Sequence, residues 1–91
     1  MQSRNKPKPT AAERRHIERI AAMNCAVCRA DGPSEVHEPE QGLWYAAVPL
    51  CPSCHRDPKA GFHGERRAWK LRDMTIVEAL AVTIRRLMET T

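Results

Sequence analysis

Apolar residues recur at helical spacing in two stretches of the chain, one near each end. In the first stretch a narrow apolar stripe among charged residues predicts a helix over about residues 10–23; its members are Ile17, Ile20, Ala21 and Met23. In the second a broad apolar face predicts a helix over about residues 76–89; its members are Ile76, Val77, Leu80, Ala81, Ile84, Leu87 and Met88.

Both predicted helices begin with the same start signal. Thr10 is followed three residues later by Glu13, and Thr75 is followed three residues later by Glu78. This spacing is typical of a capping box, in which the hydroxyl and the carboxylate each bond a free backbone amide of the first turn. Asn24 follows the first helix at a position that favours a left-handed residue.

The middle of the chain has the pattern of a β-hairpin followed by two short, separate helical segments. Residues 34–38 and 46–50 are short strand candidates, separated by a segment that contains proline and glycine. Pro52 suits the first turn of a helix, and a further helical segment is expected over about residues 65–71. An irregular hairpin between two terminal helices predicts an α+β fold.

The length of the chain limits how this fold can be stabilised. Ninety-one residues make one domain, expected over residues 10–91, and residues 1–9 read as a disordered basic arm. A domain this small usually needs a metal, a disulfide or a partner in addition to its core. The N-terminal residues carry no apolar segment of a secretory signal, so a reducing cytoplasm is expected, where metal is favoured over disulfide.

The four cysteines form two C-x-x-C pairs, Cys25 with Cys28 and Cys51 with Cys54. Two such pairs separated by 22 residues are typical of a structural zinc held by four thiolates. Two disulfides are the main alternative. Cys51 to His55 also spells a haem attachment motif, and Cys51 with Cys54 resembles a redox dithiol, but each of these readings explains only one of the two pairs.

Three histidines lie near the predicted zinc site. His37 belongs to the first strand candidate, His55 directly follows a predicted zinc ligand, and His63 stands between Gly61 and Gly64. The strand and the helix would bring the first two rings together, and the glycines allow the sharp turn that would return the third. The three histidines are therefore expected to converge beside the hairpin, which a single surface or core histidine would not explain.

At these residues the chain resembles a known family. The stretches "EVHEP", "VPLCPSCHRD" and "HG" resemble the zinc-stapled HNH endonucleases, most of all the small phage and prophage HNH proteins, over residues 25–64. The resemblance implies a ββα-metal core of the treble-clef type and hydrolysis of DNA phosphodiester bonds. It implies that His37 activates water as general base, that His55 binds a catalytic divalent metal (Mg2+, Mn2+, Ni2+ or Zn2+), and that His63 is a further ligand.

The chain departs from the family pattern beside the predicted base. The family has Asp or His immediately before that histidine, and this chain has Val36 there. Either Glu38 or His37 itself is expected to supply the missing ligand, or the site is weakened. The alternative function is a non-catalytic, zinc-stapled module that binds nucleic acid or acts as an adaptor.

The charge distribution favours a polyanionic partner. The net charge is +4, with basic residues near both ends and acidic residues in the middle. DNA, or RNA, is therefore the expected partner rather than a membrane, through phosphate contacts of Arg14, Arg15, Arg56, Lys59, Arg66, Arg67 and Lys70. If the apolar face of the last helix is exposed, a protein partner or a second copy is also expected there.

Overall fold

The computed structural model describes residues 8–56 and 74–90 of the chain. The elements in order are α1 (Ala11–Ala21), β1 (Glu35–His37), the 3-10 helix η2 (Trp44–Ala46), β2 (Val48–Leu50), α2 (Pro52–Arg56) and α4 (Ile76–Glu89). The mixed α+β class is therefore confirmed. The predicted helix over 65–71 and most of the predicted arm lie outside the described residues.

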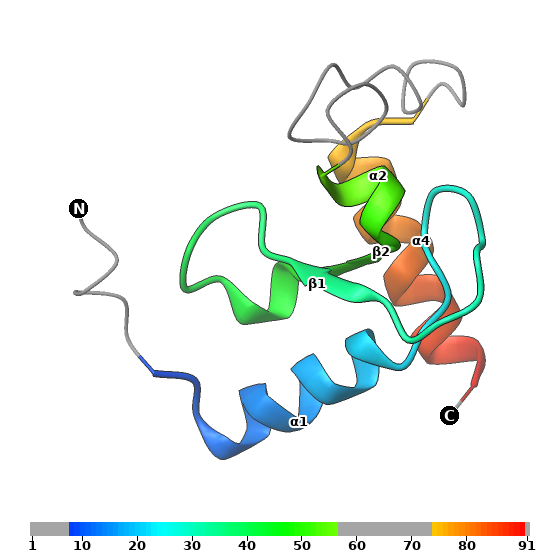
Figure 1. The fold of residues 1–91 in the computed structure, drawn as a ribbon. Coiled ribbons are helices and arrows are strands. Elements are labelled where there is room, and N and C mark those ends of the chain that lie inside the picture. Colours follow the sequence, from blue (N-terminus) through cyan, green and yellow to red (C-terminus); the bar gives the residue numbers. More distant parts are fainter. Residues whose placement is uncertain (1–7, 57–73, 91) are drawn as a thin grey trace.

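The two strands pair as the antiparallel hairpin that the sequence predicts, although both are shorter than expected. Glu35 lies opposite Leu50, and His37 lies opposite Val48. The second strand begins only at Val48, because residues 44–46 turn into the 3-10 helix η2. In Figure 1, α1 and η2 lie below this hairpin and α2 lies above it, while α4 runs from beside α2 past the hairpin toward the end of α1.

Both capping boxes form as predicted. The Glu13 amide donates to Thr10 Oγ1 over 3.1 Å, and the Thr10 amide donates to Glu13 Oε1 over 2.7 Å. At the start of α4 the Glu78 amide donates to Thr75 Oγ1 over 3.1 Å, and the Thr75 amide donates to Glu78 Oε1 over 2.8 Å. Each pair satisfies two amides that the first turn of a helix leaves without an intrahelical partner.

The end of α1 differs from the prediction. Asn24 is not left-handed; among the described residues other than glycine, that conformation belongs to Arg29, with φ of 68°. Asn24 instead accepts the Gly32 amide at its side-chain oxygen, over 2.9 Å. The returning segment passes so close to α1 that a Cβ at Gly32 would lie 2.7 Å from the Met23 carbonyl oxygen, so glycine is needed there.

The core lies between the hairpin, the first cysteine pair and α4. Val48, Leu50 and Ala79 are completely buried, and the cysteine pairs pack into the same cluster. No helix within residues 8–56 and 74–90 has the length and apolar character that crossing a membrane requires.

The buried face of α4 is not the predicted one. Ala79 and Thr83 are fully buried, and the Thr83 hydroxyl donates to the Ala79 carbonyl over 2.8 Å. The partly buried apolar residues Ile76, Leu80 and Leu87 belong to the predicted face, whereas Val77, Ala81, Ile84 and Met88 are exposed. The small side chains of Ala79 and Thr83 allow the helix to lie close to the core, and this turns part of the apolar face toward solvent.

Candidate metal and histidine site

The hairpin brings the two cysteine pairs together. Cys25 and Cys28 follow α1, Cys51 directly follows β2, and Cys54 lies in α2. Their four sulfur atoms all lie within 4.8 Å of one another, and none takes part in a disulfide. The predicted four-cysteine cluster is confirmed, and it can hold a metal ion.

One of the sulfur–sulfur distances can be compared with that of a tetrahedral zinc site. Four ligands at the usual Zn–S distance of about 2.3 Å in a tetrahedron lie about 3.8 Å from one another, and Cys28 Sγ lies 3.6 Å from Cys51 Sγ. In each pair the second cysteine's amide donates to the first cysteine's sulfur over 3.5 Å, Cys28 to Cys25 and Cys54 to Cys51. Such bonds stabilise thiolate, which is the form that binds metal.

The backbone around the first pair holds its position against β2. The Cys25 amide donates to the Ala30 carbonyl over 2.9 Å, and the left-handed Arg29 closes the same turn by donating to the Cys25 carbonyl over 3.1 Å. The Ala26 amide donates to the Pro49 carbonyl over 2.9 Å. The turn is thus bonded to the strand that ends at the second pair, which sets the distance between the pairs.

The thiols of the cluster have unequal pKa values. Burial raises the pKa of Cys25, but backbone hydrogen bonds, that from Cys28 first, outweigh it and lower this pKa to about 7. Burial raises the pKa of both Cys51 and Cys54, and for Cys54 the nearby Cys25 raises it further. In the metal-free protein at neutral pH these two thiols are therefore protonated.

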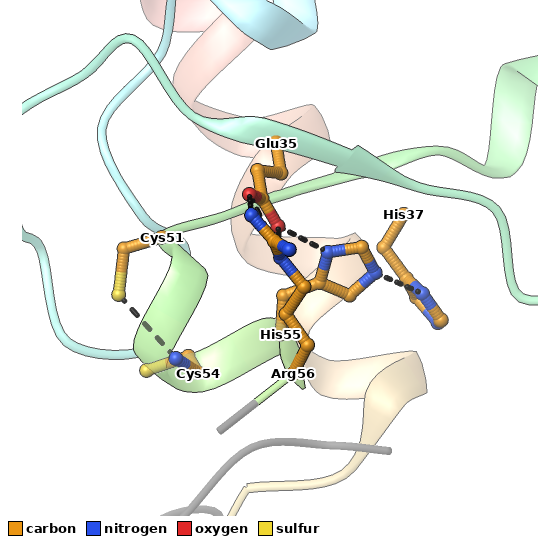
Figure 2. A network of polar contacts seen from close by, with 6 residues as sticks. All are labelled: Glu35, His37, Cys51, Cys54, His55 and Arg56. Atoms are coloured by element: carbon orange, nitrogen blue, oxygen red, sulfur yellow. Dashed lines mark hydrogen bonds and ion pairs between the residues drawn. The ribbon is translucent and has the colours of Figure 1, made fainter. Parts of the chain in front are cut away.

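Beside the cysteine cluster two histidines face each other, as Figure 2 shows. His37 comes from β1 and is 4% exposed, and His55 comes from α2 directly after Cys54. His37 Nδ1 lies 3.2 Å from His55 Nε2, and the rings are nearly perpendicular, with an interplanar angle of 73°. The predicted approach of these two rings is present.

A carboxylate that the sequence interpretation did not select completes this group. Glu35 Oε1 accepts from His55 Nδ1 over 2.8 Å, and the Arg56 guanidinium binds both oxygens of Glu35 (Figure 2). The hydrogen bonds from Arg56 and then from His55 lower the pKa of the Glu35 carboxyl. The signal that could have found it is the period of a strand, because residues two apart, such as Glu35 and His37, face the same side.

The ionised Glu35 determines which nitrogen of His55 carries the proton. A carboxylate only accepts, so Nδ1 of His55 must donate, and neutral His55 then turns the lone pair of Nε2 toward His37. Two nitrogen ligands at about 2.0–2.1 Å on one tetrahedral ion are separated by about 3.3 Å, close to the 3.2 Å observed here. The pair can therefore either share a proton or present two ligands to one divalent ion.

The remaining predicted site residues lie in several places. Glu38 accepts the Gly42 amide over 3.1 Å in the turn after β1. Arg14 and Arg15 are exposed on α1, whereas Arg56 is paired with Glu35. The remaining residues lie outside the described part of the chain: His63, Lys59, Arg66, Arg67 and Lys70.

Comparison with protein-family models, with curated proteins and with solved structures found no match to this chain.

The role of Glu35 can be tested through the protonation of His55. The variant Glu35→Ala removes the acceptor from Nδ1, and we expect His55 to change from the Nδ1-protonated form to a mixture of both tautomers. Imidazole 15N shifts at neutral pH report this, since the two nitrogens of His55 would become more alike. Glu38→Ala is the matched control and should leave these shifts unchanged; an equal change in both variants would contradict the assignment.

Proposed function

We propose that this protein is a metal-dependent, HNH-type endonuclease with a ββα-metal core of the treble-clef type, stapled by a structural zinc on its four cysteines. The observation that carries the proposal is the pair His37 and His55, with nitrogens 3.2 Å apart beside the four-cysteine cluster. A strand histidine and a helix histidine in this order match the motif that the sequence resembles.

The cysteine cluster and the histidine pair would have different tasks. Zinc on the cysteines would hold three segments in one arrangement, because each contributes at least one ligand. These segments are the turn that carries Cys25 and Cys28, the end of β2 and α2. The histidine pair would then be presented by β1 and α2, whose relative position depends on that arrangement. A second divalent ion bound there would offset the charge that develops on a phosphate during hydrolysis.

The residues of the chain have defined roles in this proposal. In this proposal Nε2 of His55 would hold the second ion, and Glu35 positions the His55 ring by accepting from Nδ1. His37 is proposed as the general base that takes a proton from the attacking water. His63, which lies outside the described residues, and Glu38 remain proposed as further contributors.

The basic residues support DNA as the substrate. Arg14 and Arg15 are exposed on α1 and can bind phosphates, with an affinity that falls as the salt concentration rises. Arg56 would not contribute in the same way, because its guanidinium already binds Glu35 on both oxygens. Its role is to keep Glu35 ionised and in place.

A plasmid cleavage assay tests the function. The zinc-loaded full chain is first treated with a chelator that removes the second ion but is too weak to remove zinc from the cysteines. It is then incubated with supercoiled DNA, to which Mg2+, Mn2+, Ni2+ or Zn2+ is added. We expect metal-dependent nicking, and we expect His37→Ala to lower its rate by about 10²–10⁴-fold, the usual contribution of a general base. His16→Ala is the matched control, since His16 on α1 packs against Tyr45 of η2 and is not part of the histidine pair.

The alternative function has its own outcome in this assay. His37 is only 4% exposed, which favours a site that holds its histidines for structure rather than for reaction with water. If none of the four metals supports cleavage while DNA binding is intact, the enzyme proposal fails and a non-catalytic nucleic-acid-binding module takes its place. Equal loss of cleavage in His37→Ala and His16→Ala would contradict the role given to His37.

A further inference from the structure

Helix α4 has an exposed apolar stripe in addition to the face that it buries in the core. The exposed fractions are 71% for Val77, 40% for Ile84 and 70% for Met88, and Ala81 between them is also exposed. Single exposed apolar residues are ordinary, but a continuous stripe of them along a whole helix is typical of an interaction surface.

The spacing of the stripe is that of a helix-pairing seam. Val77, Ala81, Ile84 and Met88 stand at intervals of four, three and four residues, the alternation that keeps side chains on one side of a supercoiled pair of helices. The core-facing residues Ala79 and Thr83 point to a different side of α4. The helix can therefore pack on its own core and on a second helix at once.

The residues that border the stripe indicate which helix would fit. On one border lie two exposed residues of opposite charge, Glu78 and Arg85, two turns apart. On the other border lie Leu80 and Leu87, which are partly buried. One border is thus charged and the other apolar.

We propose that α4 binds α4 of a second copy of this chain in an antiparallel pair. In that orientation Val77 lies opposite Met88 of the partner copy, and Ala81 lies opposite Ile84, so that each small residue meets a larger one. Glu78 of each copy then lies beside Arg85 of the other, and the leucine border of each copy lies along that of the other. A parallel pair would place Arg85 near Leu80 instead and would leave both charges without a partner across the interface.

The size of this surface predicts a weak complex. A 14-residue helix is about 21 Å long, at 1.5 Å per residue. A pair of such helices buries less than the roughly 1,200 Å2 of a standard stable interface, so we expect a dissociation constant on the order of 10–100 µM. This inference does not depend on the nuclease proposal.

Sedimentation velocity of the zinc-loaded full chain tests the proposal. Between about 5 and 500 µM we expect the mass to rise from that of a monomer toward that of a dimer. Ile84→Glu places a charge in the centre of the seam and should raise the dissociation constant at least about 30-fold, because it buries two unpaired carboxylates. Zinc content and circular dichroism of this variant show whether the exposed substitution has left the fold intact.

A charge reversal tests the orientation. Arg85→Glu would place like charges beside each other twice in the antiparallel pair, and we expect it to raise the dissociation constant about 10-fold. Arg14→Glu is the matched control, since Arg14 is also exposed on a helix and also lies four residues before a glutamate. A chain that stays monomeric at every concentration overturns the proposal, and a dimer that Arg85→Glu leaves unchanged overturns the antiparallel orientation.

Discussion

Removal of the metal from the four-cysteine cluster is expected to unfold the protein. The free energy of binding a structural zinc is about 10–16 kcal/mol near neutral pH, as large as or larger than the 5–15 kcal/mol by which domains are usually stable. Cys25 and Cys54 are themselves part of the buried core, so losing the ion also removes a cross-link within that core. Circular dichroism during titration with a strong chelator should show loss of helix, and added zinc should restore it.

The need for the metal can also be tested with cysteine variants and by varying the pH. Cys54→Ser should lower the zinc content and the melting temperature, whereas Ser53→Ala, on the exposed side of the same helix, should not. Because burial raises the pKa values of Cys51 and Cys54, zinc must displace protons to bind these thiols, so its affinity falls as the pH falls. Retained helix in the presence of chelator, with the metal shown to be absent, would contradict this prediction.

Truncation of Leu50 is expected to cost more stability than any other single change in the hairpin. Leu50 is completely buried, and it belongs to the same core cluster as Cys25 and Cys54. Leu50→Ala removes its packing and leaves a cavity, so we expect a loss of about 2–5 kcal/mol in the free energy of unfolding. Leu43→Ala is the matched control, because the Leu43 side chain is 50% exposed and should contribute much less.

Urea unfolding in zinc-containing buffer compares the two leucine variants. The midpoint should fall strongly for Leu50→Ala and only slightly for Leu43→Ala, with similar slopes if both unfold in two states. Equal losses would mean that the cluster around Leu50 does not form the stabilising core that the structure shows.

The starts of the two long helices could be predicted from the sequence because the information is local. A threonine and a glutamate three residues apart form their hydrogen bonds within a single turn, so both capping boxes are present where the sequence places them. The cysteine cluster was predictable for a related reason, since the two C-x-x-C pairs have few other uses in one small chain.

The parts that the sequence did not predict depend on contacts between distant segments. The choice of Glu35 as the partner of His55 depends on which side of β1 faces α2, and that follows from the pairing of β1 with β2. The burial of Ala79 and Thr83 depends on how closely α4 approaches the core, which hydrophobic periodicity does not report. Asn24 likewise bonds a segment that returns eight residues later rather than its own turn.

The pairing of β1 with β2 has a consequence for how this chain can change in evolution. Glu35 lies opposite Leu50, and Cys51 follows immediately, so one hairpin register aligns the histidine pair and the cysteine cluster together. An insertion of one residue within either strand would turn alternate side chains to the opposite face and misplace both groups at once. Insertions are instead expected to accumulate in the connection between the strands, where length can vary without shifting either site.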